Sequence, residues 1–315
     1  MKSLKILAVT DNRPGHVKQT EAIIRSLSDL TPVDIEYMGV NCDLKSDLKN
    51  WTLAIISLLR QSKKPSKGPD IVIGTGSHTH ATAIRMSIPH GSKKIICMSP
   101  PTGFRYLFDL CLIPQHDMAP PTNNSFFTTG PPNLSKNLNG HDTHKGLILI
   151  GGIDPKSHKW NSKNIFESVK SIIDKEQNIQ WTISTSPRSP EDMEKLLFTA
   201  SKKLNYTFCP FSQTPKYWLE KQYAENKYVW VTADSMSMVY EAISAGCSVG
   251  LIPIEWKNPN NKFSKSEKNL VSKGYVASYE KWLKDKDYPT RNHDLNEAKR
   301  CAVEILKRWW PERLP

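Results

Sequence analysis

The clearest chemical signal in the sequence is a polar turn between a predicted buried strand, residues 229–232, and a predicted helix, residues 237–245. The turn and the first helical turn contain Asp234, Ser235, Ser237, Met238 and Glu241. Unpaired N–H groups and the dipole at a helix N-terminus suit a phosphate, and Glu241 follows at a spacing suited to ribose hydroxyls. An ordinary helix capped by Asp234 or Ser235 is the alternative. The pattern alone fits both interpretations.

Two further loops follow predicted strands in the same half of the chain. Gly151 and Gly152 come directly after a strand, and their missing side chains would let backbone amides approach a diphosphate. Arg188 lies in residues 185–190, after the predicted strand 180–184, where it is placed to clamp phosphate oxygens. A tight turn and a solvated arginine explain the same residues without any ligand.

The first strand-to-helix loop, residues 11–16, carries a candidate general base. In doubly wound domains this loop opens at the carboxyl edge of the sheet, where ligands bind. Because imidazole titrates near neutral pH, His16 is suited to take a proton from an acceptor hydroxyl. Asp11 is the competing candidate for the base. A purely structural histidine is the alternative.

Small and polar residues at other predicted strand ends of the first half are expected to line an acceptor site. These residues are Arg13, Gly15, Gly76, Ser77, His116 and Asp117. Alternatively, these residues only form hydrogen bonds with backbone groups of their own loops. The pairs His78-x-His80 and His141-x-x-His144 have no third and fourth ligand nearby in the sequence, so we expect no metal site.

Alternating strand and helix patterns must position these residues. Apolar strands and amphipathic helices alternate along both halves, which predicts parallel, doubly wound sheets. The predicted strands are residues 4–9, 33–38, 70–74, 94–98, 110–114, 147–150, 180–184, 229–232 and 248–253. The main predicted helices are residues 20–30, 44–59, 164–174 and 237–245. Residues 115–145 are rich in Pro, Asn, Thr and Gly and predict a linker, so we expect domains at residues 1–140 and 141–295.

Length and composition limit the possible classes of protein. A chain of 315 residues with 38% hydrophobic and 23% charged residues is expected to fold as two globular domains. The net charge of +12 favours anionic partners. Six scattered cysteines without a Cys-x-x-Cys pair indicate a reducing compartment. Neither a secretory leader nor a membrane-spanning run is recognisable, so we expect a cytoplasmic protein or one on the inner face of the cytoplasmic membrane.

Two basic, amphipathic segments are candidates for contact with an anionic membrane. Residues 296–315 set Trp309 and Trp310 among lysines and arginines, and residues 44–59 are flanked by Lys45, Lys49, Arg60, Lys63 and Lys64. The final helix is also expected to pack back on the N-terminal domain. Ordinary packed helices with solvated basic faces are the alternative for both segments.

Taken together, the motifs at residues 11–16, 115–117, 151–152, 185–190 and 232–242 resemble those of the mitochondrial fission ELM1-like family. This resemblance implies a glycosyltransferase-B fold, in which two Rossmann-like domains with doubly wound parallel sheets face a central cleft. The sequence departs from the family pattern at Asn12, where Gly is usual, and at residues 186–190, where Ser-Arg-Arg-Thr-Pro is usual. Residues 15–17 also resemble the first loop of the peptidoglycan-precursor glycosyltransferase, whose His faces the acceptor.

The resulting prediction is a glycosyltransferase that moves a sugar from a nucleotide-activated donor to a membrane glycolipid, such as lipopolysaccharide core. The C-terminal half would bind the donor, and the N-terminal half the acceptor, with His16 or Asp11 as the base of an inverting reaction. We expect no metal and no cofactor beyond the nucleotide-sugar co-substrate. A non-catalytic membrane scaffold that keeps the fold is the alternative. Nucleic-acid binding is not expected, because no basic run with interleaved aromatics forms a recognised motif.

Overall fold

The computed structural model describes residues 2–59, 67–285, 288 and 295–315. They form two compact units: Met1–Leu134 with Asn296–Pro315, the N-terminal unit, and Ser135–Leu295, the C-terminal unit. The two units divide between Leu134 and Ser135, a few residues before the predicted domain boundary at residue 140. The side chain of Asn137 packs closely against Gly246. A Cβ added at Gly246 would lie only 2.4 Å from Cγ of Asn137. This contact ties the segment before residue 140 to the C-terminal unit.

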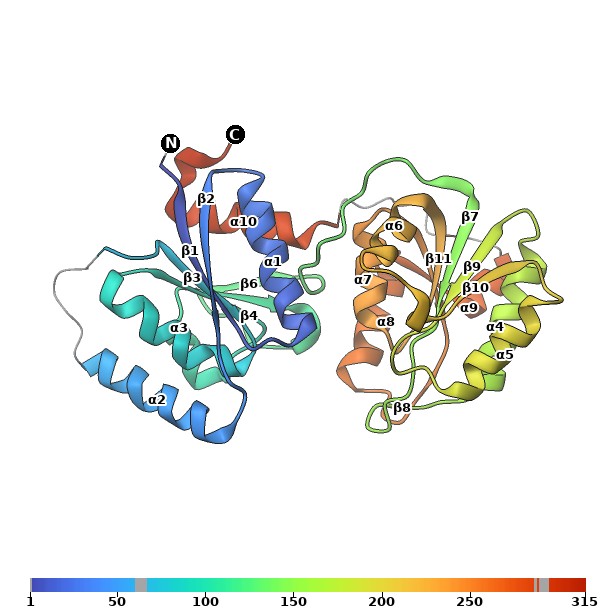
Figure 1. The fold of residues 1–315 in the computed structure, drawn as a ribbon, viewed down its shortest axis with the longest axis horizontal. Helices are drawn as coiled ribbons and strands as arrows, with labels where there is room; N and C mark the ends of the chain where they lie inside the picture. The colour runs from blue at the N-terminus through green and yellow to red at the C-terminus, as the bar shows by residue number, and fades with distance from the viewer. Residues whose placement is uncertain (1, 60–66, 286–287, 289–294) are drawn as a thin grey trace. The chain divides into compact units, whose positions relative to one another are not determined.

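The N-terminal unit is built on a six-stranded parallel sheet with the strand order β2-β1-β3-β4-β5-β6 (Figure 1). Its strands are β1 (Leu4–Thr10), β2 (Val33–Gly39), β3 (Ile71–Thr75), β4 (Lys93–Cys97), β5 (Leu110–Pro114) and β6 (Ser125–Thr128). β3 and β5 are buried along their whole length, as their continuous apolar sequences predict. Because all six strands run in one direction, the loops that follow them meet at one edge.

Helices cover both faces of this sheet. α1 (Pro14–Ser28) and α10 (Glu297–Trp309) share one apolar cluster with β1, and α3 (His80–Ser87) packs on the opposite face. α2 (Leu44–Leu59) rests on α3 and lies outermost in Figure 1. Of the residues of α2, all of them described, Ala54 alone is buried. This helix therefore leaves most of its surface uncovered by the N-terminal unit.

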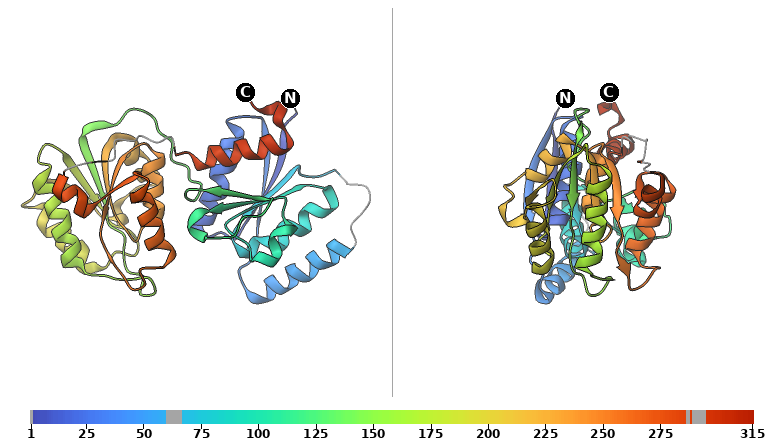
Figure 2. Two further views of the ribbon diagram at one scale, coloured as in Figure 1. Left: turned by 180° about the vertical axis from the view of Figure 1, so that it is seen from behind. Right: turned by 90° about the vertical axis from the view of Figure 1, so that its right-hand side faces the viewer.

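The last helix is part of the N-terminal core. Cys301, Ala302, Ile305 and Leu306 are fully buried, and the two tryptophans at residues 309–310 pack against the same cluster. The guanidinium of Arg313 donates to the carbonyl of Lys2 at 2.9 Å, so the two termini lie together, as Figure 2 shows. The apolar face of this helix is therefore buried in the core, whereas Trp309 and Trp310 are half-buried. Contact of these tryptophans and the basic residues with lipid stays a prediction.

The C-terminal unit repeats the architecture with a parallel sheet of order β10-β9-β7-β11-β12-β14. Its strands are β7 (Asp142–Leu149), β9 (Gln180–Ser184), β10 (Tyr206–Cys209), β11 (Asn226–Thr232), β12 (Ser248–Ile252) and β14 (Val276–Ser278). Its helices are α4 (Ser162–Lys175), α5 (Glu191–Ser201), α6 (Trp218–Glu225), α7 (Met236–Ser244), α8 (Lys262–Ser272) and α9 (Tyr279–Asp285). A short antiparallel ribbon joins β8 (His158–Lys159) to β13 (Glu255–Trp256).

The predicted linker at residues 115–145 contains more structure than its composition indicates. It holds a single 3-10 turn, η4 (Gln115–Asp117), the edge strand β6 and the start of β7. β6 has four residues and a half-buried pattern, so it offers neither the length nor the alternation that marks a strand in sequence. The linker prediction is therefore wrong for these segments.

Candidate functional site

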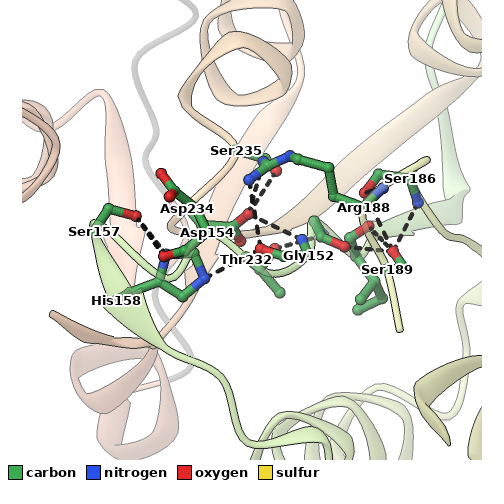
Figure 3. A network of polar contacts seen from close by, with 12 residues as sticks. Gly152, Asp154, Ser157, His158, Ser186, Arg188, Ser189, Thr232, Asp234 and Ser235 are labelled. Atoms are coloured by element: carbon green, nitrogen blue, oxygen red, sulfur yellow. Dashed lines mark hydrogen bonds and ion pairs between the residues drawn. The ribbon is translucent and has the colours of Figure 1, made fainter. Parts of the chain in front are cut away.

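Three loops meet at the carboxyl edge of the C-terminal sheet (Figure 3). They follow β9, β7 and β11, which are neighbours in the strand order, and they carry Arg188, Gly152 and Asp234. The sequence prediction that these three segments share one sheet edge is confirmed. A ligand at this edge would meet all three loops.

Asp234 holds the three loops together. Its Oδ2 accepts hydrogen bonds from the Gly152 amide at 3.0 Å and from the Ser235 hydroxyl at 3.1 Å, and it pairs with Arg188 Nη2 at 3.1 Å (Figure 3). The side chain is only 1% exposed, and its Oδ1 has no hydrogen-bond partner among the described residues. A buried carboxylate with this many donors fixes the geometry of its neighbours. Asp234 is therefore a positioning residue rather than a helix cap.

The two glycines allow neighbouring loops to pack closely. A Cβ on Gly151 would lie 2.2 Å from Asp234 Oδ2, and one on Gly152 would lie 2.1 Å from the backbone of Arg188. Their amides already donate inward, Gly151 to Thr232 Oγ1 at 2.7 Å and Gly152 to Asp234. The prediction that these amides cradle a diphosphate is therefore wrong, because both are occupied by protein acceptors.

Arg188 is a cation that this edge presents in a fixed orientation. Its side chain is 46% exposed, with one side against the Asp234 carboxylate and its Nη1 3.5 Å from the Gly152 carbonyl. The loop around it is fixed by Ser189, whose hydroxyl donates to the carbonyl of Ile150 at 3.1 Å and accepts from the Ser186 amide at 2.9 Å. The guanidinium is thus oriented and still accessible to an anion.

The N-terminus of α7 adds amide donors beside Arg188. Ser235 precedes the helix but makes no capping bond with its side chain, because its hydroxyl is engaged by Asp234. The first amides of a helix have no acceptor within the helix. Ser237 is exposed, and Met238 and Glu241 are half-buried on the first turns of α7. The helix start is therefore accessible at Ser237, whereas Ser235 and Met236 are buried.

His158 belongs to this cluster although no sequence pattern indicated it. Its Nε2 lies 3.1 Å from the Gly152 carbonyl, and its Nδ1 lies 2.7 Å from the Ser157 hydroxyl. Hydrogen bonds from the Lys156 amide and the Ser157 side chain lower the pKa of nearby Asp154. These residues come from β8 and the turn before it, and a two-residue strand leaves no recognisable periodicity. The only sequence signal that connected these residues to the site was their position a few residues after Gly152.

The candidate base of the N-terminal unit has an oriented histidine. His16, in the first turn of α1, places its Nδ1 2.7 Å from Oδ2 of Asp11, whose side chain is fully buried at the end of β1. A carboxylate that accepts from Nδ1 fixes the tautomer in which Nε2 carries the lone pair. The two competing candidates are therefore one hydrogen-bonded pair, in which the buried Asp11 carboxylate orients the His16 ring.

Gly76 shapes the space in which the His16 ring sits. It follows β3, the neighbour of β1, and its backbone has φ +88° and ψ 161°. A Cβ at this position would lie 2.5 Å from Cε1 and Nδ1 of the imidazole. Gly76 was expected to line an acceptor site, and its direct neighbour is the candidate base. By contrast, nothing lies within 4 Å of a Cβ on Gly15, which is exposed.

A second histidine and carboxylate pair lies beside the first. His78 Nδ1 is 2.7 Å from Oδ2 of Asp47, the first acidic residue of α2. Arg13 links the pairs, with its Nη2 3.3 Å from His78 Nε2 and its Nε 3.7 Å from Asp11. Sequence reasoning considered His78 only as a metal ligand, because Asp47 is distant in the chain. Among the described residues no group of three or more His, Cys, Asp or Glu is arranged to hold a metal.

The remaining expected acceptor residues are spread along the edge of the sheet. Ser77 is exposed beside His78. His116 and Asp117 form a pair at 3.7 Å in η4, which follows β5, two strands along from β3. The structure therefore brings Arg13, Gly76 and His16 together, whereas η4 lies at a separate position of the same edge.

The chain matches the family described as Mitochondrial fission ELM1 across residues 14–309. It belongs to this family. It is 25% identical to the Mitochondrial fission protein ELM1 of Arabidopsis thaliana, with 87% of this chain and 73% of that protein covered. It is 22% identical to the Uncharacterized protein RP120 of Rickettsia prowazekii (strain Madrid E), with 77% and 81% covered.

Solved structures match the fold at low sequence identity. The UDP-GlcNAc 2-epimerase of Methanocaldococcus jannaschii has a TM-score of 0.56 and 15% identity, with 97% of this chain and 100% of that chain covered. MurG of Acinetobacter baumannii has a TM-score of 0.51 and 13% identity, with 97% and 94% covered. The predicted α/β fold of the glycosyltransferase-B type is confirmed. In the described part of the chain, no helix has the length and apolar character needed to cross a bilayer.

Proposed function

We propose that this protein transfers a sugar from a nucleotide-activated donor to a hydroxyl of a membrane-associated glycolipid. The observation that carries the proposal is the half-exposed Arg188, held by buried Asp234 beside the polar start of α7. An oriented guanidinium next to free helix amides is suited to the diphosphate or monophosphate of a nucleotide. A structural neighbour, an epimerase with a TM-score of 0.51, is described in complex with UDP-GlcNAc and UDP.

The donor would bind to the C-terminal unit through Arg188 and the first turn of α7. The guanidinium and the amides at residues 236–238 would contact phosphate oxygens, while Ser237 and Glu241 would meet the nucleoside. Fixed positive charge and oriented dipoles stabilise the charge that develops on the leaving nucleotide. The proposal therefore requires no metal and no further cofactor.

The acceptor hydroxyl would be activated in the N-terminal unit by His16. Its Nε2 would take the proton as the hydroxyl oxygen attacks the anomeric carbon and the nucleotide leaves, which inverts the configuration. Asp11 would keep the ring oriented and stabilise the imidazolium that forms, as a carboxylate partner does in other histidine bases. Arg13, beside both residues, would contact an anionic part of the acceptor.

The outer face of α2 is the part of the N-terminal unit best suited to meet a membrane. Leu44, Leu48, Ile55 and Leu59 recur at helical spacing, and each is more than half exposed. Lys45 lies beside them, whereas the predicted basic residues 60, 63 and 64 lie outside the described residues. An exposed apolar stripe with a basic margin is typical of a helix lying in the interface of an anionic bilayer.

A ligand panel tests the donor site first. UDP, GDP, ADP, CMP and their sugar conjugates are added to the purified protein, and the unfolding temperature is measured. A nucleotide at 100 times its dissociation constant adds about 2.7 kcal/mol of stability. We expect one nucleotide class to stabilise the protein, and Arg188→Gln to remove that shift. Lys156→Gln, which removes an exposed charge from the loop after Gly152, is the matched control and should keep it.

Vesicle flotation tests the membrane contact. Leu48→Glu is expected to reduce binding to anionic vesicles at least tenfold, because it puts a charge into the apolar stripe. Phe211→Glu changes another exposed apolar residue, in the C-terminal unit, and should leave binding unchanged. Equal binding by both variants would remove α2 from the proposal.

A non-catalytic membrane scaffold is the second candidate function, and the family match to a fission protein favours it. A scaffold would keep the vesicle binding of α2 and would need no nucleotide. Stabilisation by a nucleotide that depends on Arg188 is expected only of the first candidate.

A further inference from the structure

A cavity of about 370 Å³ lies in the N-terminal unit between α2, α3 and the end of β2. It lies on the inner side of α2, the helix that is outermost in Figures 1 and 2. Its polar lining residues are Asn41, Ser46, Lys49, Asn50, Thr82 and Arg85. This volume falls within the range of small-molecule sites, about 300–1,000 Å³. The cavity is separate from the His16 and Asp11 pair.

The lining is positively charged and incompletely satisfied. Lys49 and Arg85 both line the cavity, and the described lining residues include no Asp or Glu. Thr82 is 1% exposed, and its hydroxyl has no hydrogen-bond partner among the described residues. The Nε atom of Arg85 is also buried and has no hydrogen-bond partner among the described residues. Buried polar groups are normally hydrogen-bonded, so each of these atoms needs an explanation.

We propose that this cavity binds a phosphate group through Arg85, Lys49 and the hydroxyl of Thr82. Phosphate oxygens accept hydrogen bonds from guanidinium, ammonium and hydroxyl donors, so that one group satisfies all three side chains. The amides of Asn41 and Asn50 supply further donors for a polyol attached to the phosphate. A carboxylate would supply fewer oxygens for the same number of donors.

The position of the cavity connects it to the acceptor side of the proposed reaction. Gly39 lines it, and a Cβ on Gly39 would lie 3.6 Å from the side-chain amide of Asn12, in the loop of His16. Ser46 lines it as well, next to Asp47 of the second histidine pair. Assigning the bound phosphate to a lipid acceptor rests on the proposed function. The phosphate site itself does not.

Calorimetric titration of the full chain with inorganic phosphate and with glycerol phosphate tests the site. Lys49→Gln and Arg85→Gln should each weaken binding about tenfold. Lys45→Gln removes the same charge from the same helix one turn earlier, outside the cavity lining, and should change affinity less than twofold. Equal weakening by Lys45→Gln and Lys49→Gln, or no binding of either probe, would overturn the proposal.

Thr82→Val separates ligand binding from folding. The valine fills the same volume and removes a hydroxyl that the protein leaves unpaired, so the unfolding temperature without phosphate should stay the same or rise. Phosphate affinity should fall about fivefold. A lower unfolding temperature together with unchanged affinity would show that the hydroxyl serves the fold, which overturns this part of the site.

Vesicles distinguish the two sources of phosphate. If the phosphate belongs to a lipid headgroup, Lys49→Gln should weaken binding to phosphatidylglycerol vesicles more than Lys45→Gln does. If it belongs to a soluble molecule, Lys49→Gln should bind vesicles no more weakly than Lys45→Gln does, while glycerol phosphate still discriminates between the two variants. Neither readout uses nucleotide or sugar transfer, so failure of the donor site and failure of this site are separate results.

Discussion

Replacement of Gly76 by alanine tests the geometry of the candidate base. The added Cβ would stand 2.5 Å from the imidazole of His16, and the backbone at φ +88° and ψ 161° lies in a region that only glycine adopts readily. The ring must therefore turn away, which breaks its 2.7 Å hydrogen bond to Asp11.

The expected cost follows from these two effects. The backbone conformation costs a non-glycine residue about 1–3 kcal/mol, and the lost hydrogen bond adds about 1 kcal/mol. A domain of this size loses about 2–4 °C in unfolding temperature per kcal/mol. Gly76→Ala should therefore lower the unfolding temperature of the N-terminal unit by about 5–15 °C, measured by calorimetry.

Gly15→Ala is the matched control. Gly15 is exposed in the first turn of α1, and nothing lies within 4 Å of an added Cβ. This change should stabilise the protein by about 0.4–1 kcal/mol. In a His16→Ala background the clash disappears, so Gly76→Ala should then cost about 1 kcal/mol less than in the wild type. Equal stability of Gly76→Ala and Gly15→Ala would show that Gly76 does not need its backbone conformation and does not confine the His16 ring.

Three further predictions concern stability. Asp234→Ala leaves the Gly152 amide and Arg188 without their acceptor and should cost about 1–3 kcal/mol in denaturant unfolding, whereas Asp174→Ala, at an exposed position of α4, should cost almost nothing. Deletion of residues 296–315 removes buried α10 from its core, so circular dichroism and calorimetry should show loss of the N-terminal unit; a folded remnant would contradict this. Burial, with a smaller effect of nearby His78, lowers the pKa of His80 to about 4. Because the unfolded chain binds this proton first, stability should fall by up to about 3 kcal/mol as pH drops from 6.5 to 4, and His80→Gln should flatten that slope.

Local pattern predicted most strands of the two sheets and the main helices of the N-terminal unit, but not α5, α6, α8 and α9 of the C-terminal unit. Buried parallel strands such as β5 are continuous apolar runs, and the predicted residues 110–114 match it. The start of α1 was predicted late because its first residues, Pro14, Gly15 and His16, are not apolar and give no helical period. Short edge strands such as β6 are not recognisable in the sequence, because four half-buried residues show no clear alternation.

The candidate site was only partly predictable. The rule that parallel strands end at one edge brought Arg188, Gly152 and Asp234 together correctly. It did not reveal which hydrogen bonds the loops make with one another, so the glycine amides were assigned to a ligand when they bind the protein. The pairing of His78 with Asp47 depends on how α2 packs, and no local pattern carries that information.

Sugar transfer from labelled nucleotide-sugars to a membrane lipid extract tests whether the protein glycosylates a lipid and whether His16 is its base. The wild type and His16→Gln are compared with the nucleotide class that stabilises the protein. We expect labelled glycolipid with the wild type and almost none with His16→Gln, although both bind the nucleotide equally. Equal labelling by the two proteins, or nucleotide binding without transfer to any lipid fraction, would contradict it.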